Sequence, residues 1–185
     1  TAAMLDEGAG ARSSLQIADA IEFLGATLVT TSSFDASAVR LNVPVARLPD
    51  ALPVMADVAL RPAFPESDFG RLKQERLTAL LQARDDPESI APLAFARVVF
   101  GPTHRYGTGA NGTEATLKAL TTERLRAFHA AFYRPSNSRL IVVGDISAET
   151  VLLHLERHFG AWKDSGTVRR QSVPAAPQPS RGQIY

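Results

Sequence analysis

Apolar residues recur every three to four positions along most of this 185-residue chain, as on the buried face of an amphipathic helix. Glycine and proline interrupt the pattern and separate one periodic segment from the next. Ser13 or Ser14 is a suitable cap for the first complete helix, which Gly25 ends. The pattern predicts helices over 14–24, 48–60, 65–83, 88–100, 113–120, 121–132 and 148–158, after a helix end over 1–6.

In one region of the chain, apolar residues recur at every second position instead. Residues 26–33 and 37–45 alternate and are rich in Thr and Val, and four residues connect them. This predicts a β-hairpin with one apolar face. A short apolar run over 139–143 predicts a further strand beside the hairpin. Helices that follow and surround a few antiparallel strands indicate an α+β fold, an antiparallel sheet with helices packed on one face.

The composition excludes several classes of function. The formal net charge is +1, so no strong field attracts nucleic acid or an anionic membrane. No apolar run approaches the ~20 residues that a membrane-spanning helix needs. The chain has no cysteine, which excludes disulfides and thiolate metal sites. We therefore expect a soluble α+β domain over residues 1–170, followed by a Pro-rich linker over 171–185.

The first thirteen residues carry the most specific pattern. Met4-Leu5, then Gly8, then Arg12-Ser13 resembles the segment that follows the inverted zinc motif His-x-x-Glu-His of the insulinase/pitrilysin peptidases. Further pieces that are similar to this family follow in the family's order. They are Ile-Glu-Phe-Leu-Gly-Ala, Ala-Leu-Arg-Pro-Ala-Phe-Pro, His-Arg-Tyr-Gly, Tyr-Arg-Pro-Ser-Asn-Ser-Arg-Leu-Ile-Val-Val-Gly-Asp-Ile and Phe-Gly-Ala-Trp.

The resemblance covers nearly the whole chain. It implies a processing-peptidase-like domain that lacks its first strands, with the linker leading to a second domain of similar fold. Members of the family pair two such halves around a chamber that admits unfolded peptides.

The same resemblance implies that this domain is not catalytic. An active member binds zinc through two His of the motif and a Glu from a downstream helix, and the motif's Glu is the general base. The motif's final Glu-His falls here on Ala2 and Ala3, and the zinc-binding Glu of the downstream helix falls on Gln82. We therefore expect no catalytic residue, no metal ligand and no cofactor in this chain, and zinc only in an active partner half.

Glu75 matches the other glutamate of that helix. It is either a residual polar group facing the vestigial site or a partner of Arg71 or Arg76 on a solvated face. His154 and His158, four residues apart on one helix, are spaced for zinc, but Glu156 lies about 200° from either and cannot act as their base. We expect both to be structural.

Three other features have more ordinary explanations than a metal or phosphate site. His104 is expected to satisfy backbone groups of its loop, and His129 to be packed at a boundary. Asp85-Asp86-Pro87 is expected to stop a helix. Gly107, Gly109 and Gly112 lack the Lys-Ser/Thr and the preceding strand of a phosphate-binding loop.

Three functions fit these observations. The first is a non-catalytic domain that closes the chamber and binds peptide for a catalytic half or homologous subunit. The second is an active zinc endopeptidase whose ligands come from outside this sequence. The third is a purely structural subunit, like the core proteins of a respiratory complex.

Overall fold

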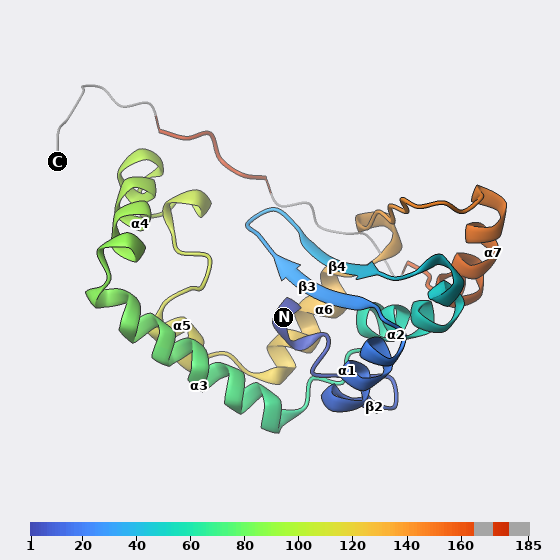
Figure 1. Ribbon diagram of the computed structural model, residues 1–185. Coiled ribbons are helices and arrows are strands. Elements are labelled where there is room, and N and C mark those ends of the chain that lie inside the picture. The colour runs from blue at the N-terminus through green and yellow to red at the C-terminus, as the bar shows by residue number, and fades with distance from the viewer. Residues whose placement is uncertain (165–171, 178–185) are drawn as a thin grey trace. The chain divides into compact units, whose positions relative to one another are not determined.

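The computed structural model describes residues 1–164 and 172–177. Helices dominate, and the strands form two small antiparallel sheets (Figure 1). The first part of the chain contains η1 (Ala2–Met4), β1 (Gly8–Ala9), β2 (Arg12–Ser13), α1 (Ser14–Phe23), β3 (Thr27–Ser32), β4 (Ser37–Asn42), η2 (Val45–Arg47) and α2 (Leu48–Leu60). The remainder contains α3 (Glu66–Gln82), η3 (Ala83–Asp85), α4 (Pro87–Phe100), η4 (Arg105–Gly107), α5 (Glu114–Lys118), α6 (Thr122–Phe132), η5 (Pro135–Asn137) and α7 (Ala148–Phe159).

The chain divides into two compact units. The first combines Thr1–Phe69 with the described residues from Thr121 onward up to 164. The second combines Gly70–Leu120 with the described segment 172–177. Among the described residues, every buried apolar side chain except Leu117 belongs to the first unit, so the main hydrophobic core is there.

The predicted hairpin is confirmed, and its register explains its one-sided burial. β3 pairs with β4 so that Leu28 faces Leu41 and Thr30 faces Val39. These four side chains are half-buried while their neighbours along each strand are mostly exposed, as the period of two requires. β4 contacts α2, and β3 contacts η1. The sheet therefore presents its apolar face to the core.

The strand predicted over 139–143 is wrong. Within the described residues this segment pairs with no strand, and Ile141 and Val143 are 81% and 94% exposed. The apolar composition of this segment is typical of a strand, but a strand also needs a neighbour to complete its ladder of hydrogen bonds. The predicted helices, by contrast, all form within about two residues of their expected ends.

Local signals account for the helix ends. Ser13 caps α1 and forms a capping box with Gln16, as its place in the sequence predicts. Asp86 accepts hydrogen bonds from the backbone N–H groups of Glu88 and Ser89 at the start of α4. The acidic pair before Pro87 is thus a helix boundary rather than a metal site.

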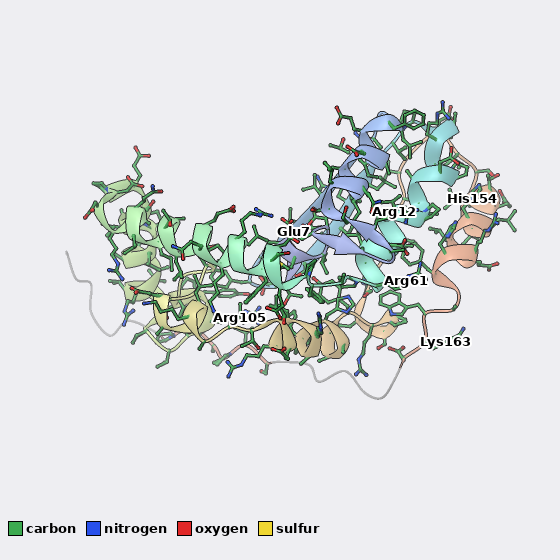
Figure 2. All side chains as sticks on the ribbon, turned by 90° about the horizontal axis from the view of Figure 1, so that it is seen from below. Glu7, Arg12, Arg61, Arg105, His154 and Lys163 are labelled. Carbon is green, nitrogen blue, oxygen red and sulfur yellow. The ribbon has the colours of Figure 1, made fainter. Side chains whose placement is uncertain are left out.

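A buried carboxylate joins α2 to the β1–β2 sheet. Asp57 is 6% exposed, and its Oδ2 accepts a hydrogen bond of 2.6 Å from Arg12 while Oδ1 accepts one of 2.9 Å from Arg61 Nε. The two arginine side chains come from β2 and from the residue after α2 (Figure 2). The sequence pattern does not indicate this cluster, because Arg12 and Asp57 lie 45 residues apart.

Gly10 packs closely against Asp57. Gly10 has φ of +59°, and a Cβ placed there would lie 2.7 Å from Asp57 Oδ2. Gly25 has a similar φ of +62°, but nothing lies within 4 Å of its would-be Cβ. Alanine at either position would need the unfavourable left-handed backbone, but only at Gly10 would its Cβ also collide with Asp57.

We predict that Gly10→Ala destabilises the protein clearly more than Gly25→Ala. Gly25→Ala should cost about 1–2 kcal/mol, the penalty of a left-handed alanine. Gly10→Ala adds the displacement of a buried ion-paired carboxylate. Urea unfolding of both variants measures the difference, and equal losses would show that Asp57 moves away without cost.

Helix α6 fastens the loop before α3. Arg126 donates hydrogen bonds of 3.1 Å to the carbonyl oxygens of Ala63 and Phe64, and His129 Nε2 donates one of 2.9 Å to that of Ala59. Phe64 is 2% exposed and has φ of +50°, an uncommon value for a bulky residue. These bonds hold the strained backbone from which α3 starts.

His129 makes this attachment sensitive to acid. Burial lowers the pKa of His129 below its ordinary value of 6.5, and the bond to Ala59 offsets this only in part. The unfolded chain then binds a proton more readily than the folded one in the window below 6.5. The contribution of His129 to stability is complete above that pH and declines as the pH falls toward the folded pKa.

We predict that His129→Gln reduces the loss of stability between pH 7 and pH 5. Glutamine retains an N–H donor for Ala59 but does not titrate. The measurement is the free energy of unfolding of both proteins across this range. His158, whose pKa burial also lowers, is present in both proteins and affects them equally. If the free energies of unfolding of the two proteins decline in parallel between pH 7 and pH 5, His129 is not the source of the acid sensitivity.

Candidate functional site

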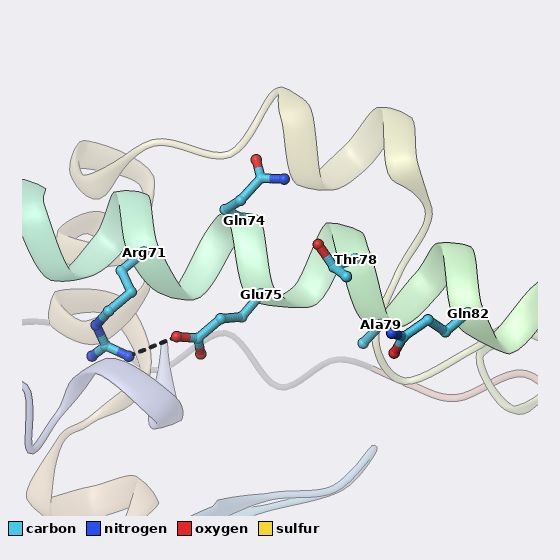
Figure 3. A pocket seen from close by; sticks show the side chains of 6 residues that line it. All are labelled: Arg71, Gln74, Glu75, Thr78, Ala79 and Gln82. Atoms are coloured by element: carbon cyan, nitrogen blue, oxygen red, sulfur yellow. Dashed lines mark hydrogen bonds and ion pairs between the residues drawn. The ribbon is translucent and has the colours of Figure 1, made fainter.

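The candidate site is one face of α3. Glu75 and Gln82 are seven residues apart, which is nearly two helical turns, so they lie on the same face. A shallow hollow of about 450 Å³, open to solvent, runs along this face (Figure 3). Its lining consists of Arg71, Gln74, Glu75, Thr78, Ala79 and Gln82.

The opposite face of α3 explains why this one stays open. Lys73 lies about 200° round the helix from Arg71, and its Nζ donates hydrogen bonds of 2.8 Å and 3.0 Å to the carbonyl oxygens of Lys118 and Leu120. Arg76 donates a hydrogen bond to Asn111, and Arg84 forms an ion pair with Glu114 at 2.8 Å. The helix is thus attached to α5 and its flanking loops from one side, and the residues of the hollow are exposed on the other.

Glu75 forms the expected ion pair with Arg71 on a solvated face. It lines the hollow, and its Oε1 lies 3.0 Å from Arg71 NH1 in an ion pair across one turn (Figure 3). Both side chains are about half exposed, so the pair contributes at most about 1 kcal/mol to stability. The pair matters more for the chemistry of the hollow, because the one carboxylate among its six lining residues already has a cationic neighbour.

Gln82 occupies the position where the family resemblance implies a zinc-binding glutamate. Its neutral amide offers a carbonyl oxygen without charge, a weaker ligand for a divalent cation than a carboxylate. Ala2 and Ala3 belong to η1 in the first unit, whereas Gln82 belongs to the second. Across the described residues, no three His, Asp, Glu or Cys side chains gather closely enough to hold a metal ion.

The histidines have structural environments. His104 is 7% exposed, its Nδ1 accepts a hydrogen bond from the Tyr106 N–H, and its Nε2 lies 2.9 Å from the carbonyl oxygen of Pro174. This confirms that it satisfies loop backbone groups. His154 and His158 lie on α7, which packs against α2. The pKa of His158 is lowered by burial first, then by Arg157 and His154.

Three residues of the hollow escaped sequence analysis. Gln74, Thr78 and Ala79 carry no motif, yet their spacing from Arg71 is three, seven and eight residues, the spacing of one helical face. Once Glu75 and Gln82 are chosen, this spacing alone predicts the other members of the lining.

Comparisons with known proteins identify the fold. The family profile described as the peptidase M16 inactive domain matches residues 119–185. The solved structure of a peptidase M16 inactive domain from Pseudomonas fluorescens is 27% identical, with a TM-score of 0.86, and the match covers 95% of this chain and 43% of that one. Over residues 119–185 the chain thus matches the peptidase M16 inactive domain, and over nearly its whole length it is similar in fold to a solved example of that domain.

Relatives with curated names show the same relationship. A zinc protease of Mycobacterium leprae is 27% identical over 98% of this chain and 39% of the relative, and one of Streptomyces coelicolor is 26% identical over 96% and 38%. The chain thus spans about two fifths of the length of these relatives. Pitrilysin itself, at 17% identity and a TM-score of 0.76 over 94% of this chain and 19% of that one, shares the fold. Among the described residues no helix is long and apolar enough to cross a membrane.

We predict that the purified chain contains far less than one zinc per molecule and cleaves no peptide. The α3 face supplies one ion-paired carboxylate, and catalytic zinc sites need three protein ligands. Gln82→Glu, which adds a single carboxylate, should leave the zinc content unchanged. Metal analysis by mass spectrometry tests both proteins; stoichiometric zinc in the unmodified chain would refute the prediction.

Proposed function

We propose that this domain is the non-catalytic half of a zinc-peptidase assembly, in which it closes the chamber and binds peptide for an active partner. The proposal rests on the chemistry of the α3 face. Gln82 lies where the family resemblance implies a zinc-binding glutamate, and Glu75 is paired with Arg71. A face with this chemistry can bind a substrate but cannot activate water through a metal.

The hollow has groups suited to an extended peptide. The amides of Gln74 and Gln82 and the hydroxyl of Thr78 can each donate and accept hydrogen bonds, and all three are exposed. Such groups can bond to backbone N–H and C=O groups, which every peptide carries. Binding of this kind tolerates many sequences, as a chamber for unfolded peptides requires.

The exposed segment over 139–143 supports a role in association. Leu140, Ile141, Val142 and Val143 are 46%, 81%, 46% and 94% exposed. Among the described residues this apolar run has no strand partner. Contiguous apolar exposure of this kind marks surfaces that another protein covers. We assign this segment to the contact with the catalytic half, a subunit or domain that carries an intact His-x-x-Glu-His motif.

We predict that the chain copurifies with such a catalytic half and raises its peptidase rate. Ile141→Asp/Val143→Asp should abolish copurification, because two charges cannot be buried unpaired in the contact. Phe23→Asp, which replaces an 85% exposed apolar residue on α1, is the matched control and should leave it unchanged.

The peptide-binding role has a separate readout. Gln74→Ala/Gln82→Ala should leave copurification intact but raise the KM of the assembled peptidase with little change in kcat, since only uniform binding is lost. If the partner is equally active and equally stable without this chain, the helper role fails and a purely structural subunit is the better description.

A further inference from the structure

An aromatic cluster lies at the end of α4, away from the α3 hollow residues. The ring of His104 stacks on Phe100 with centroids 5.3 Å apart and an interplanar angle of 18°, and Tyr106 lies 5.5 Å from His104 and 5.6 Å from Phe100. The backbone around the cluster is tightly folded. A Cβ at Gly107 would lie 1.9 Å from the carbonyl oxygen of Gly101, so only glycine fits there.

The hydrogen bonds of His104 fix its tautomer. Nδ1 accepts a hydrogen bond of 3.1 Å from the Tyr106 N–H, so Nδ1 carries no proton. Nε2 must then carry the proton, and it donates to the carbonyl oxygen of Pro174 at 2.9 Å. The histidine is therefore a polar donor set among aromatic rings, with its donor aimed at the Pro-rich segment.

The segment that receives this bond has a recognisable pattern. Residues 174–177 read Pro-Ala-Ala-Pro. In a polyproline II helix, three residues make one turn, so two prolines three apart lie on the same side. The second proline is close as well, since Pro177 Cγ lies 3.9 Å from the position of a Cβ at Gly101.

We propose that Phe100, Gly101, His104 and Tyr106 form a proline-recognition cradle whose resident ligand is this chain's own Pro174–Pro177 segment. Proteins recognise Pro-x-x-Pro segments with grooves lined by aromatic side chains; here His104 adds a hydrogen bond to the carbonyl oxygen of Pro174. The Pro-rich segment is then a strap bound to the second unit rather than a free linker. This inference is independent of the proposed peptidase role, since it uses none of the α3 hollow residues.

The test is to remove the prolines that occupy the cradle and to measure binding of a separate Pro-rich peptide; the variant without these prolines is called the emptied chain. Pro174→Ala/Pro177→Ala in the full chain removes the resident prolines, and the probe is the peptide acetyl-Ser-Val-Pro-Ala-Ala-Pro-Gln-amide. A tethered segment competes at an effective concentration of about millimolar, so the probe should bind the emptied chain roughly tenfold more tightly than the unmodified chain. The same peptide with both prolines replaced by alanine is the control and should not bind.

Nitrogen NMR of the His104 ring gives a second, independent measurement. In the unmodified chain Nε2 should be protonated and protected from solvent exchange, and this protection should be lost in the emptied chain and restored by the probe. His104→Phe in the emptied chain keeps an aromatic ring but removes the donor, and should weaken probe binding. Equal affinity for both chains, no binding to either, or a His104 signal unchanged by Pro174→Ala/Pro177→Ala would each overturn the proposal.

Discussion

The buried carboxylate of Asp57 is the interaction on which the first unit depends. Asp57 is 6% exposed, and a carboxylate this buried is tolerated only where cationic partners compensate its charge. Here Arg12 donates a hydrogen bond to one carboxylate oxygen and Arg61 donates one to the other. The arginines remain in contact with water, with side chains 38% and 71% exposed, so the cost of desolvation falls mainly on Asp57. The arrangement specifies where β2 meets α2, because no other described carboxylate contacts Arg12 in this way.

Backbone pairing extends from this cluster to the start of α3. The Gly10 N–H donates to the Arg61 carbonyl oxygen at 2.9 Å, and the Ala63 N–H donates to that of Gly8 at 2.8 Å. Arg126 then binds the next two carbonyl groups from α6. Two of the sequence pieces that resemble the family, 5–13 and 59–65, are therefore in direct contact. Their resemblance reflects one packed substructure that sets the first residue of the helix bearing the candidate site.

The sequence predicts what is local and fails where a partner is distant. The helices, the Ser13 cap and the hairpin follow from periodicity and turn chemistry within a few residues. The segment over 139–143 has the composition of a strand, but composition cannot show whether a neighbouring strand exists. The site follows the same rule. Glu75 and Gln82 are placed on one face by spacing alone, and the Arg71 pair is an i,i+4 contact, whereas the Asp57 cluster joins residues 45 positions apart.

The residues that hold the fold are different from those that the zinc chemistry would use. Gly10, Arg12, Asp57 and Arg126 make long-range contacts, and Gln82 is exposed at the end of α3. Ala2 and Ala3 carry only methyl side chains, and that of Ala2 is buried in the core. A change at the exposed Gln82 therefore leaves these long-range contacts in place. This agrees with the proposed non-catalytic role, in which the domain keeps its architecture without zinc ligands. It also means that the glycine and arginine pieces are evidence for the fold, and that activity must be judged from the site residues.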